Sequence, residues 1–177
     1  MRIRIGLWAA LAVLVVPAFA VSAIIVIPKA VALAKLRGVN EVPSVITDAS
    51  GDFTAKIFAD HVDFKLSFSG LTGDTLFAHI HVGQQHTLGG VSVFLCTNVA
   101  GTPPVQPCPH GSGTITGTFS AADVIGPTGQ GVDAQEFAAL LTAIAEGATY
   151  TNVHTTAFPT GEIRGQNVQI GTTPTGE

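Results

Sequence analysis

Long stretches of this chain alternate apolar and polar residues, and this pattern restricts each stretch to a β-strand with one buried face. Residues 62–69 place apolar side chains at every second position, with Asp63, Lys65 and Ser67 on the opposite face. Residues 52–59 follow the same period. The polar link at residues 60–61 therefore predicts a hairpin between two half-buried strands.

Further strand-like runs follow along the chain, separated by clusters of Gly, Pro, Asn and Asp. The NEVP segment, which contains Glu41 and Pro43, predicts a turn after the first strand, with a structural role for Glu41. Together with the hairpin, the runs make about eight short strands. The additional predicted strands cover residues 31–37, 76–82, 91–96, 113–119, 149–155 and 162–170.

One segment has the spacing of a helix. Asp133 and Glu136 have the spacing of a capping box, and the apolar residues Phe137, Leu140 and Ile144 then recur at helical intervals until residue 147. We predict one amphipathic helix over about 133–146, with Leu141 also on its apolar side. The resulting fold class is all-β: an antiparallel Greek-key β-sandwich or flattened barrel with one inserted α-helix.

The amino-terminal segment resembles an export signal. Arg2 and Arg4 precede an apolar run over residues 5–27, and residues 17–20 (PAFA) supply a small-x-small cleavage pattern. The run is also long enough to span a bilayer as an uncleaved anchor. We therefore predict that residues 1–23 are a signal peptide or a membrane anchor, that 31–170 form one extracytoplasmic domain, and that 171–177 form a flexible tail.

The charge distribution excludes nucleic acids as partners. The formal net charge is −4, and no run of Lys and Arg is present to neutralise phosphates. Cleavage after Ala20 would remove two of the 8 basic side chains and leave all 12 acidic ones. A membrane is an expected partner only through an uncleaved amino-terminal segment.

The two cysteines, Cys96 and Cys108, bracket the Pro-rich sequence TNVAGTPPVQP. In an exported protein such a pair favours a disulfide, because the compartment is oxidising. Two unpaired thiols are the alternative.

A strand with two histidines is the most informative motif for function. In residues 76–83, LFAHIHVG, the alternation sends His79 and His81 to the same face, away from the core. Two imidazoles at this spacing can converge on one metal ion, although two solvent-facing histidines also occur by chance. His154 lies on the strand predicted over 149–155, and three imidazoles meet if the two strands are neighbours.

The other histidines carry weaker signals. His86 follows in the Gly-rich loop GQQHTLGG, where it is either a fourth ligand or a solvated loop residue. His61 and His110 are expected at the surface. A Ser-His-Asp hydrolase is not indicated, because the sequence contains no GxSxG elbow.

Several motifs occur in the order typical of one known family: LRGVNEVPSVITDASG, FSGLTG, AHIHVG and YTNVHTTAFPTGEIRGQ. With these motifs the chain resembles a CHRD domain over residues 33–170, the module found in chordin and singly in exported prokaryotic proteins. The resemblance implies a β-sandwich in an extracytoplasmic location. In chordin, domains of this family are associated with the binding of secreted growth factors, so the resemblance also implies a protein partner.

Some single-domain bacterial members of that family resemble copper superoxide dismutases. By this analogy His79, His81 and His154 are copper ligands. Three neutral imidazoles without a thiolate suit copper first and zinc second, in line with the Irving–Williams order. Arg164 is then the cation that draws superoxide in, or else an exposed strand residue paired with Glu41 or Glu162.

Two hypotheses of function follow. In the first, the protein binds one copper ion through these histidines and has an activity similar to superoxide dismutase. In the second, it is a non-enzymatic module that binds a secreted or cell-envelope protein, and the histidines are structural.

Overall fold

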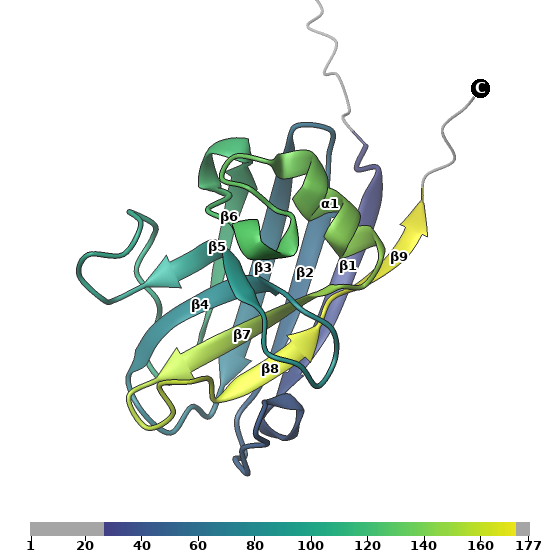
Figure 1. Cartoon of the computed structure of the whole chain (residues 1–177). Helices are drawn as coiled ribbons and strands as arrows, with labels where there is room; N and C mark the ends of the chain where they lie inside the picture. Colours follow the sequence, from purple (N-terminus) through teal and green to yellow (C-terminus); the bar gives the residue numbers. More distant parts are fainter. Residues whose placement is uncertain (1–26, 173–177) are drawn as a thin grey trace, which may run out of the picture.

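The computed structural model describes residues 27–172 (Figure 1). The predicted leader, residues 1–23, lies outside this range, as do residues 173–177 of the predicted tail. Within it, no helix is long and apolar enough to cross a membrane.

The described chain forms an antiparallel sheet of nine strands with one α-helix, which confirms the predicted fold class. The sheet order is β5-β4-β7-β8-β1-β2-β3-β6, and β9 also pairs with β1. The strands are β1 (Ala30–Arg37), β2 (Ser50–Ile57), β3 (His61–Ser69), β4 (Thr75–Val82), β5 (Gly90–Thr97), β6 (Gly113–Ser120), β7 (Thr149–Thr155), β8 (Ile163–Gln166) and β9 (Val168–Thr172). The helices are the 3-10 turns η1 (Gly38–Asn40), η2 (Ala121–Asp123) and η3 (Thr128–Gln130) and the α-helix α1 (Phe137–Ala145).

The sheet folds into a flattened, nearly closed barrel with two layers (Figure 1). We call β5, β4, β7 and β8 the front layer, and β6, β3, β2, β1 and β9 the back layer. The pairing of β8 with β1 joins the layers on one side. On the other side the amide of Gln106 bridges the edge strands, since its Nε2 donates to Leu95 O at 3.3 Å and to Thr116 O at 3.1 Å.

Alternation in the strands creates the core between the layers. In β1 the residues Ala32, Ala34 and Leu36 are buried while their neighbours are exposed or half-buried, and β2 and β3 repeat this pattern. The small alanines of β1 let the rings of β2 and β3 pack inside, where Phe53 and Phe64 lie with centroids 6.5 Å apart. Burial of such side chains is the main source of stability in a sandwich of this kind.

Cys96 and Cys108 form a disulfide, as predicted. The bond closes the loop that follows β5, and Asn98 ties the same loop by donating to Cys108 O at 3.0 Å. A disulfide indicates an oxidising compartment.

The α-helix begins later than predicted, at Phe137 rather than near Asp133. Gln135 adopts a positive φ of 67°, which interrupts a helical path, although the Asp133 N–H still donates to Glu136 Oε2 at 3.0 Å as in a capping box. The buried side chains of α1 are Phe137, Leu140 and Ile144, whereas Leu141 is half-buried.

The strand predicted over 162–170 is two strands in the structure. β8 pairs with β7 of the front layer, while β9 pairs with β1 of the back layer, and Asn167 lies between them. Asn167 is buried, accepts from Thr151 Oγ1 at 2.9 Å and donates to Thr149 Oγ1 at 3.1 Å. These bonds allow the chain to change layers without leaving buried polar groups unpaired.

Candidate metal centre

The two histidines of β4 lie on the outer face of the front layer. Ala78, Ile80 and Val82 point into the core, as predicted from the alternation, and His79 and His81 occupy the opposite face. Two irregularities in the pairing of β4 with β5, at Ala78/His79 and Ile80/His81, give this strand extra local bend.

These histidines are buried rather than solvent-facing. His79 is 4% exposed, His81 is 7% exposed and His154 is 7% exposed. Loops cover this side of the front layer, and two of their carbonyls, at Gly89 and Pro159, contact the rings directly. Periodicity could not show this burial, because it gives the face of a strand but not what packs on it.

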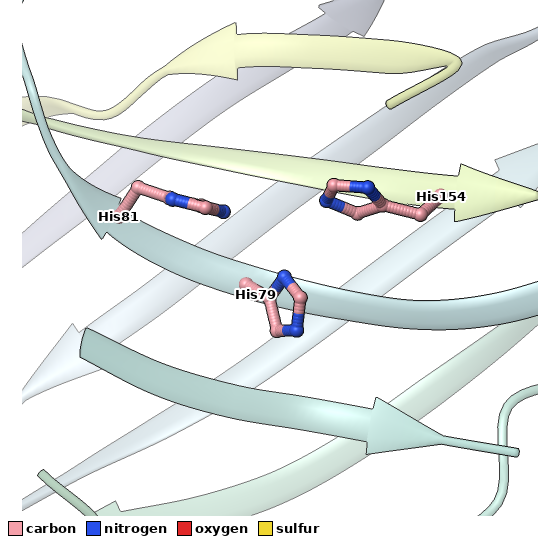
Figure 2. Close-up of side chains that lie close together, drawn as sticks. All are labelled: His79, His81 and His154. Atoms are coloured by element: carbon pink, nitrogen blue, oxygen red, sulfur yellow. The ribbon is translucent and has the colours of Figure 1, made fainter. Parts of the chain in front are cut away.

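β7 pairs with β4, which places His154 beside the other two histidines. The ring centroid of His79 is 5.3 Å from that of His81 and 5.0 Å from that of His154. The centroids of His81 and His154 are 6.2 Å apart. One nitrogen from each ring lies within 4.8 Å of the others. Figure 2 shows the three rings gathered in one place from two neighbouring strands.

The hydrogen bonds leave a free nitrogen on every ring. His81 Nδ1 lies 3.0 Å from Gly89 O, and His154 Nδ1 lies 3.0 Å from Pro159 O. Because a carbonyl only accepts, each Nδ1 carries the proton and each Nε2 presents a lone pair. The Nε2 atoms of both rings, and both nitrogens of His79, are buried without a hydrogen-bond partner.

The three imidazoles are neutral near pH 7. Burial lowers the pKa of His79 to about 2 and that of His154 to about 4. Burial is also the main cause of the lowered pKa of His81. The neutral ring is the form that ligates a metal, so protons do not compete for these nitrogens at neutral pH.

The spacing and the hydrogen bonding of the three rings fit what a metal ion requires. Metal–nitrogen bonds of about 2.0–2.1 Å require ligand nitrogens within about 4 Å of one another, which small ring movements from the present spacing achieve. Buried nitrogens without partners are rare in proteins and call for an explanation such as an ion. A carbonyl on the second nitrogen of a ligating histidine is typical of metal sites. The three-histidine cluster could therefore hold a metal ion.

Arg164 lies beside the cluster, but it is buried, with 2% of its surface exposed. Its Cζ atom is 3.4 Å from the centroid of the Tyr150 ring, and this ring also stacks on His81, with centroids 4.6 Å apart and an interplanar angle of 5°. Its Nη atoms donate to Thr87 O at 2.7 Å and to Gln84 O at 2.9 Å. Arg164 thus holds the loop that supplies the Gly89 carbonyl to His81.

The remaining predicted residues lie apart from this arrangement. His86 is exposed in the same loop, with a positive φ of 64°, and is outside the three-histidine cluster. His61 and His110 lie at the surface, where each contacts an aspartate. Arg164 is buried and makes no ion pair with Glu41 or Glu162 in the described chain, so the exposed pair predicted as its alternative role does not form.

Glu41 is a buried acid that the sequence predicted only as a turn residue or as an exposed partner of Arg164. Burial raises its pKa to about 7, against the opposing effect of Arg164. Its Oε1 has no hydrogen-bond partner, and a Cβ built on Gly161 would lie 2.4 Å from that atom. The NEVP and TGEIRG motifs therefore meet in space. The sequence signal that could have pointed to Glu41 is that both motifs belong to the same family pattern. The contact between the two motifs is visible only in the structure.

Glu162 is a second buried acid, and it joins several segments around the site. Its carboxylate accepts from Thr47 Oγ1 at 3.0 Å, from Thr72 N at 2.9 Å and Thr72 Oγ1 at 2.8 Å, and from Thr155 Oγ1 at 2.7 Å. Thr155 directly follows the ligand candidate His154. Glu162 therefore fixes the end of β7 relative to two loops.

Comparison with known proteins gives one result. A family model described as the CHRD domain matches residues 32–167, which is most of the chain. No curated protein and no solved structure matches.

Proposed function

Since the chain belongs to the CHRD domain family, we propose that it is an exported protein that binds one copper ion through His79, His81 and His154. The observation that carries this proposal is the set of four ring nitrogens that are buried without any partner. An apolar side chain would fill this space without the cost of desolvating imidazoles, so the histidines need a ligand to account for them.

Copper is the metal that this donor set favours. Three neutral nitrogen donors without a thiolate suit copper and zinc, and copper binds more tightly wherever it is available. The disulfide supports an oxidising compartment, and the predicted leader supports export to it. Copper bound there supplies one-electron chemistry.

The chain's own residues would fix the ligands and keep water away. The carbonyls of Gly89 and Pro159 set the orientation of two rings. Phe77 and Phe94 flank His79, with centroids 4.6 Å and 4.2 Å from the imidazole. These contacts give the third ring an apolar surrounding in place of a hydrogen bond.

A direct test uses Tyr150, the single tyrosine of the chain, which stacks on His81. Replacing the single tryptophan, Trp8→Phe, leaves Tyr150 as the dominant fluorophore whether or not the leader is cleaved. Titration with Cu(II) should quench its emission with one-to-one stoichiometry, and Zn(II) should bind more weakly and compete.

Single-site variants then assign the ligands. His79→Ala and His154→Ala should each lower copper affinity at least tenfold, because a chelate loses a donor. His61→Ala and His110→Ala are the matched controls and should leave it unchanged. His86→Ala tests the predicted fourth ligand, and a tenfold loss there would include it. Equal affinity in the parent and in His154→Ala would remove the three-histidine site and favour the protein-binding hypothesis.

Superoxide dismutation is a second candidate, favoured by one observation. The positive charge of Arg164 contributes to the lowered pKa of His81, so this charge acts on the cluster. A cation at this position would also attract an anion. Copper-loaded parent protein should then consume superoxide, and Arg164→Lys should retain more of that activity than Arg164→Gln. Absence of turnover in the fully loaded parent would exclude this activity and leave copper binding intact.

A further inference from the structure

The exposed cations of this domain are confined to one face. Within residues 27–172 there are six Lys and Arg side chains, and one of them, Arg164, is buried at the metal centre. The other five are exposed and lie on β1, β2 and β3 or just before β1. We call these five residues the basic face: Lys29, Lys35, Arg37, Lys56 and Lys65.

The basic face is the outer surface of the back layer, because its residues alternate with the core residues of the same strands. Lys35 pairs with Asp52, and Asp63 accepts from Thr118 Oγ1 at 2.6 Å. Lys56 and Lys65 have no acidic partner in the described chain. Asp63 lies opposite Lys56 in the register of β2 and β3 but forms no ion pair with it, so both lysines can meet an outside anion.

An apolar stripe runs along the edge of the same face. Leu33 and Val168 are register partners on β1 and β9, and Ile170 pairs with the next outward position, Val31. These side chains are 38%, 55% and 49% exposed for Leu33, Val168 and Ile170. Lys56 lies directly opposite Val31 on β2, so cations border the stripe.

The apolar leader joins the chain at this face. The apolar run ends at Ile27, only three positions before β1 begins. If the run stays in a bilayer, three residues span about 10 Å, so β1 lies next to the lipid headgroups. If the chain is cut after Ala20, the sequence VSAIIVI still precedes the same strand.

From these observations we propose that the basic face rests on an anionic membrane surface, with the apolar stripe in the headgroup region. Cations spread over a strand surface and bordering an apolar stripe match a two-dimensional anionic layer. The metal centre lies on the outer face of the front layer, on the opposite side of the barrel. Docking of this kind leaves the metal centre facing away from the membrane.

A fluorophore can report which face touches the lipid, independently of the leader. The two cysteines of the chain are joined in the disulfide, so a new cysteine can be labelled selectively. Thr54→Cys places an environment-sensitive dye on the basic face between Leu33 and Lys65, and Ala138→Cys places it on the exposed side of α1. With vesicles containing phosphatidylglycerol, emission should shift to the blue for the first label only. Phosphatidylcholine vesicles should cause little shift.

Matched charge variants test the electrostatic part. Each lysine near an anionic surface contributes about a fivefold gain in affinity. Lys56→Gln with Lys65→Gln should therefore weaken binding to the anionic vesicles at least tenfold, and 0.5 M salt should do the same to the parent. Ala138→Glu with Ala145→Glu changes the net charge equally on the exposed side of α1 and should have a much smaller effect.

Three results would overturn the proposal. They are an equal loss in both double variants, an equal spectral shift of both labels, and binding to soluble polyglutamate without binding to vesicles, which would indicate an acidic protein partner instead. Circular dichroism melts of each variant confirm that the fold is intact before binding is compared.

Discussion

Replacement of Glu162 by Gln tests how much the buried carboxylate, which has hydrogen bonds but no ion-pair partner among the described residues, contributes to the stability of the fold around the site. Glu162 is fully buried and accepts four hydrogen bonds shorter than 3.1 Å, from Thr47, Thr72 and Thr155. Hydrogen bonds to charged groups stabilise a protein by about 1.5–3 kcal/mol, against about 0.5–1.5 kcal/mol for neutral pairs. The difference is about 1 kcal/mol for each bond.

In the Glu162→Gln variant, one oxygen becomes an amide group that must face Thr155 Oγ1. This hydroxyl now donates to Glu162 and accepts from Phe158 N at 3.2 Å. It can accept a second hydrogen bond, from the Gln amide, only if it no longer donates to residue 162. A neutral side chain also costs less to bury, which offsets part of the loss. We expect a net destabilisation of about 2–4 kcal/mol, and a fall in melting temperature of roughly 5–15 °C.

Urea unfolding followed by circular dichroism measures this quantity directly. Glu146→Gln, at the exposed end of α1, is the matched control and should change stability by less than about 0.5 kcal/mol. If Glu162→Gln is as stable as this control, the carboxylate does not hold the segments together.

The other predictions concern charge and packing. The folded-state pKa values of His79 and His154 lie below the unfolded value, so in the metal-free protein each should contribute a loss of about 2 kcal/mol between pH 7 and pH 5, partly offset by Glu41, and His154→Gln should lack the contribution of His154. Glu41 has a raised folded pKa, so its stabilisation is present below pH 4.5 and falls by about 3 kcal/mol as the pH rises past 7; Glu41→Gln should lack this fall in urea titrations. Leu140→Ala should cost about 2–5 kcal/mol and the half-buried Leu141→Ala clearly less, with copper affinity of the folded protein unchanged; a tenfold loss of copper affinity would contradict a purely structural role for α1.

Much of the fold could be predicted from the sequence because side-chain direction in a strand is a local property. The alternation in residues 62–69 determines which side of β3 is buried, and the same rule places His79 and His81 together on the side away from the core. The disulfide was predictable for a different reason, since the expected export to an oxidising compartment favours a bond between the two cysteines of the sequence. Thus the strands, the fold class and two of the three clustered histidines followed from the residues alone.

Strand boundaries were less predictable where the chain changes layers. The strand predicted over 162–170 looks continuous in the sequence, yet it divides at Asn167, because β8 and β9 pair with different strands. The start of α1 also differs from the prediction. Gln135 has a positive φ that is incompatible with a helix, although the capping hydrogen bond between Asp133 and Glu136 is present.

Only the tertiary structure decided what covers the outer face of the front layer. Alternation cannot distinguish a face exposed to water from a face covered by loops, because burial there depends on the paths of segments far away in the sequence. For that reason the sequence placed His79 and His81 on the face away from the core without indicating that the face is covered, whereas the fold buries both of them and Arg164 and brings Glu41 against Gly161. The pairing of β4 with β7, which brings His154 to the cluster, is likewise a long-range contact that no local pattern specifies.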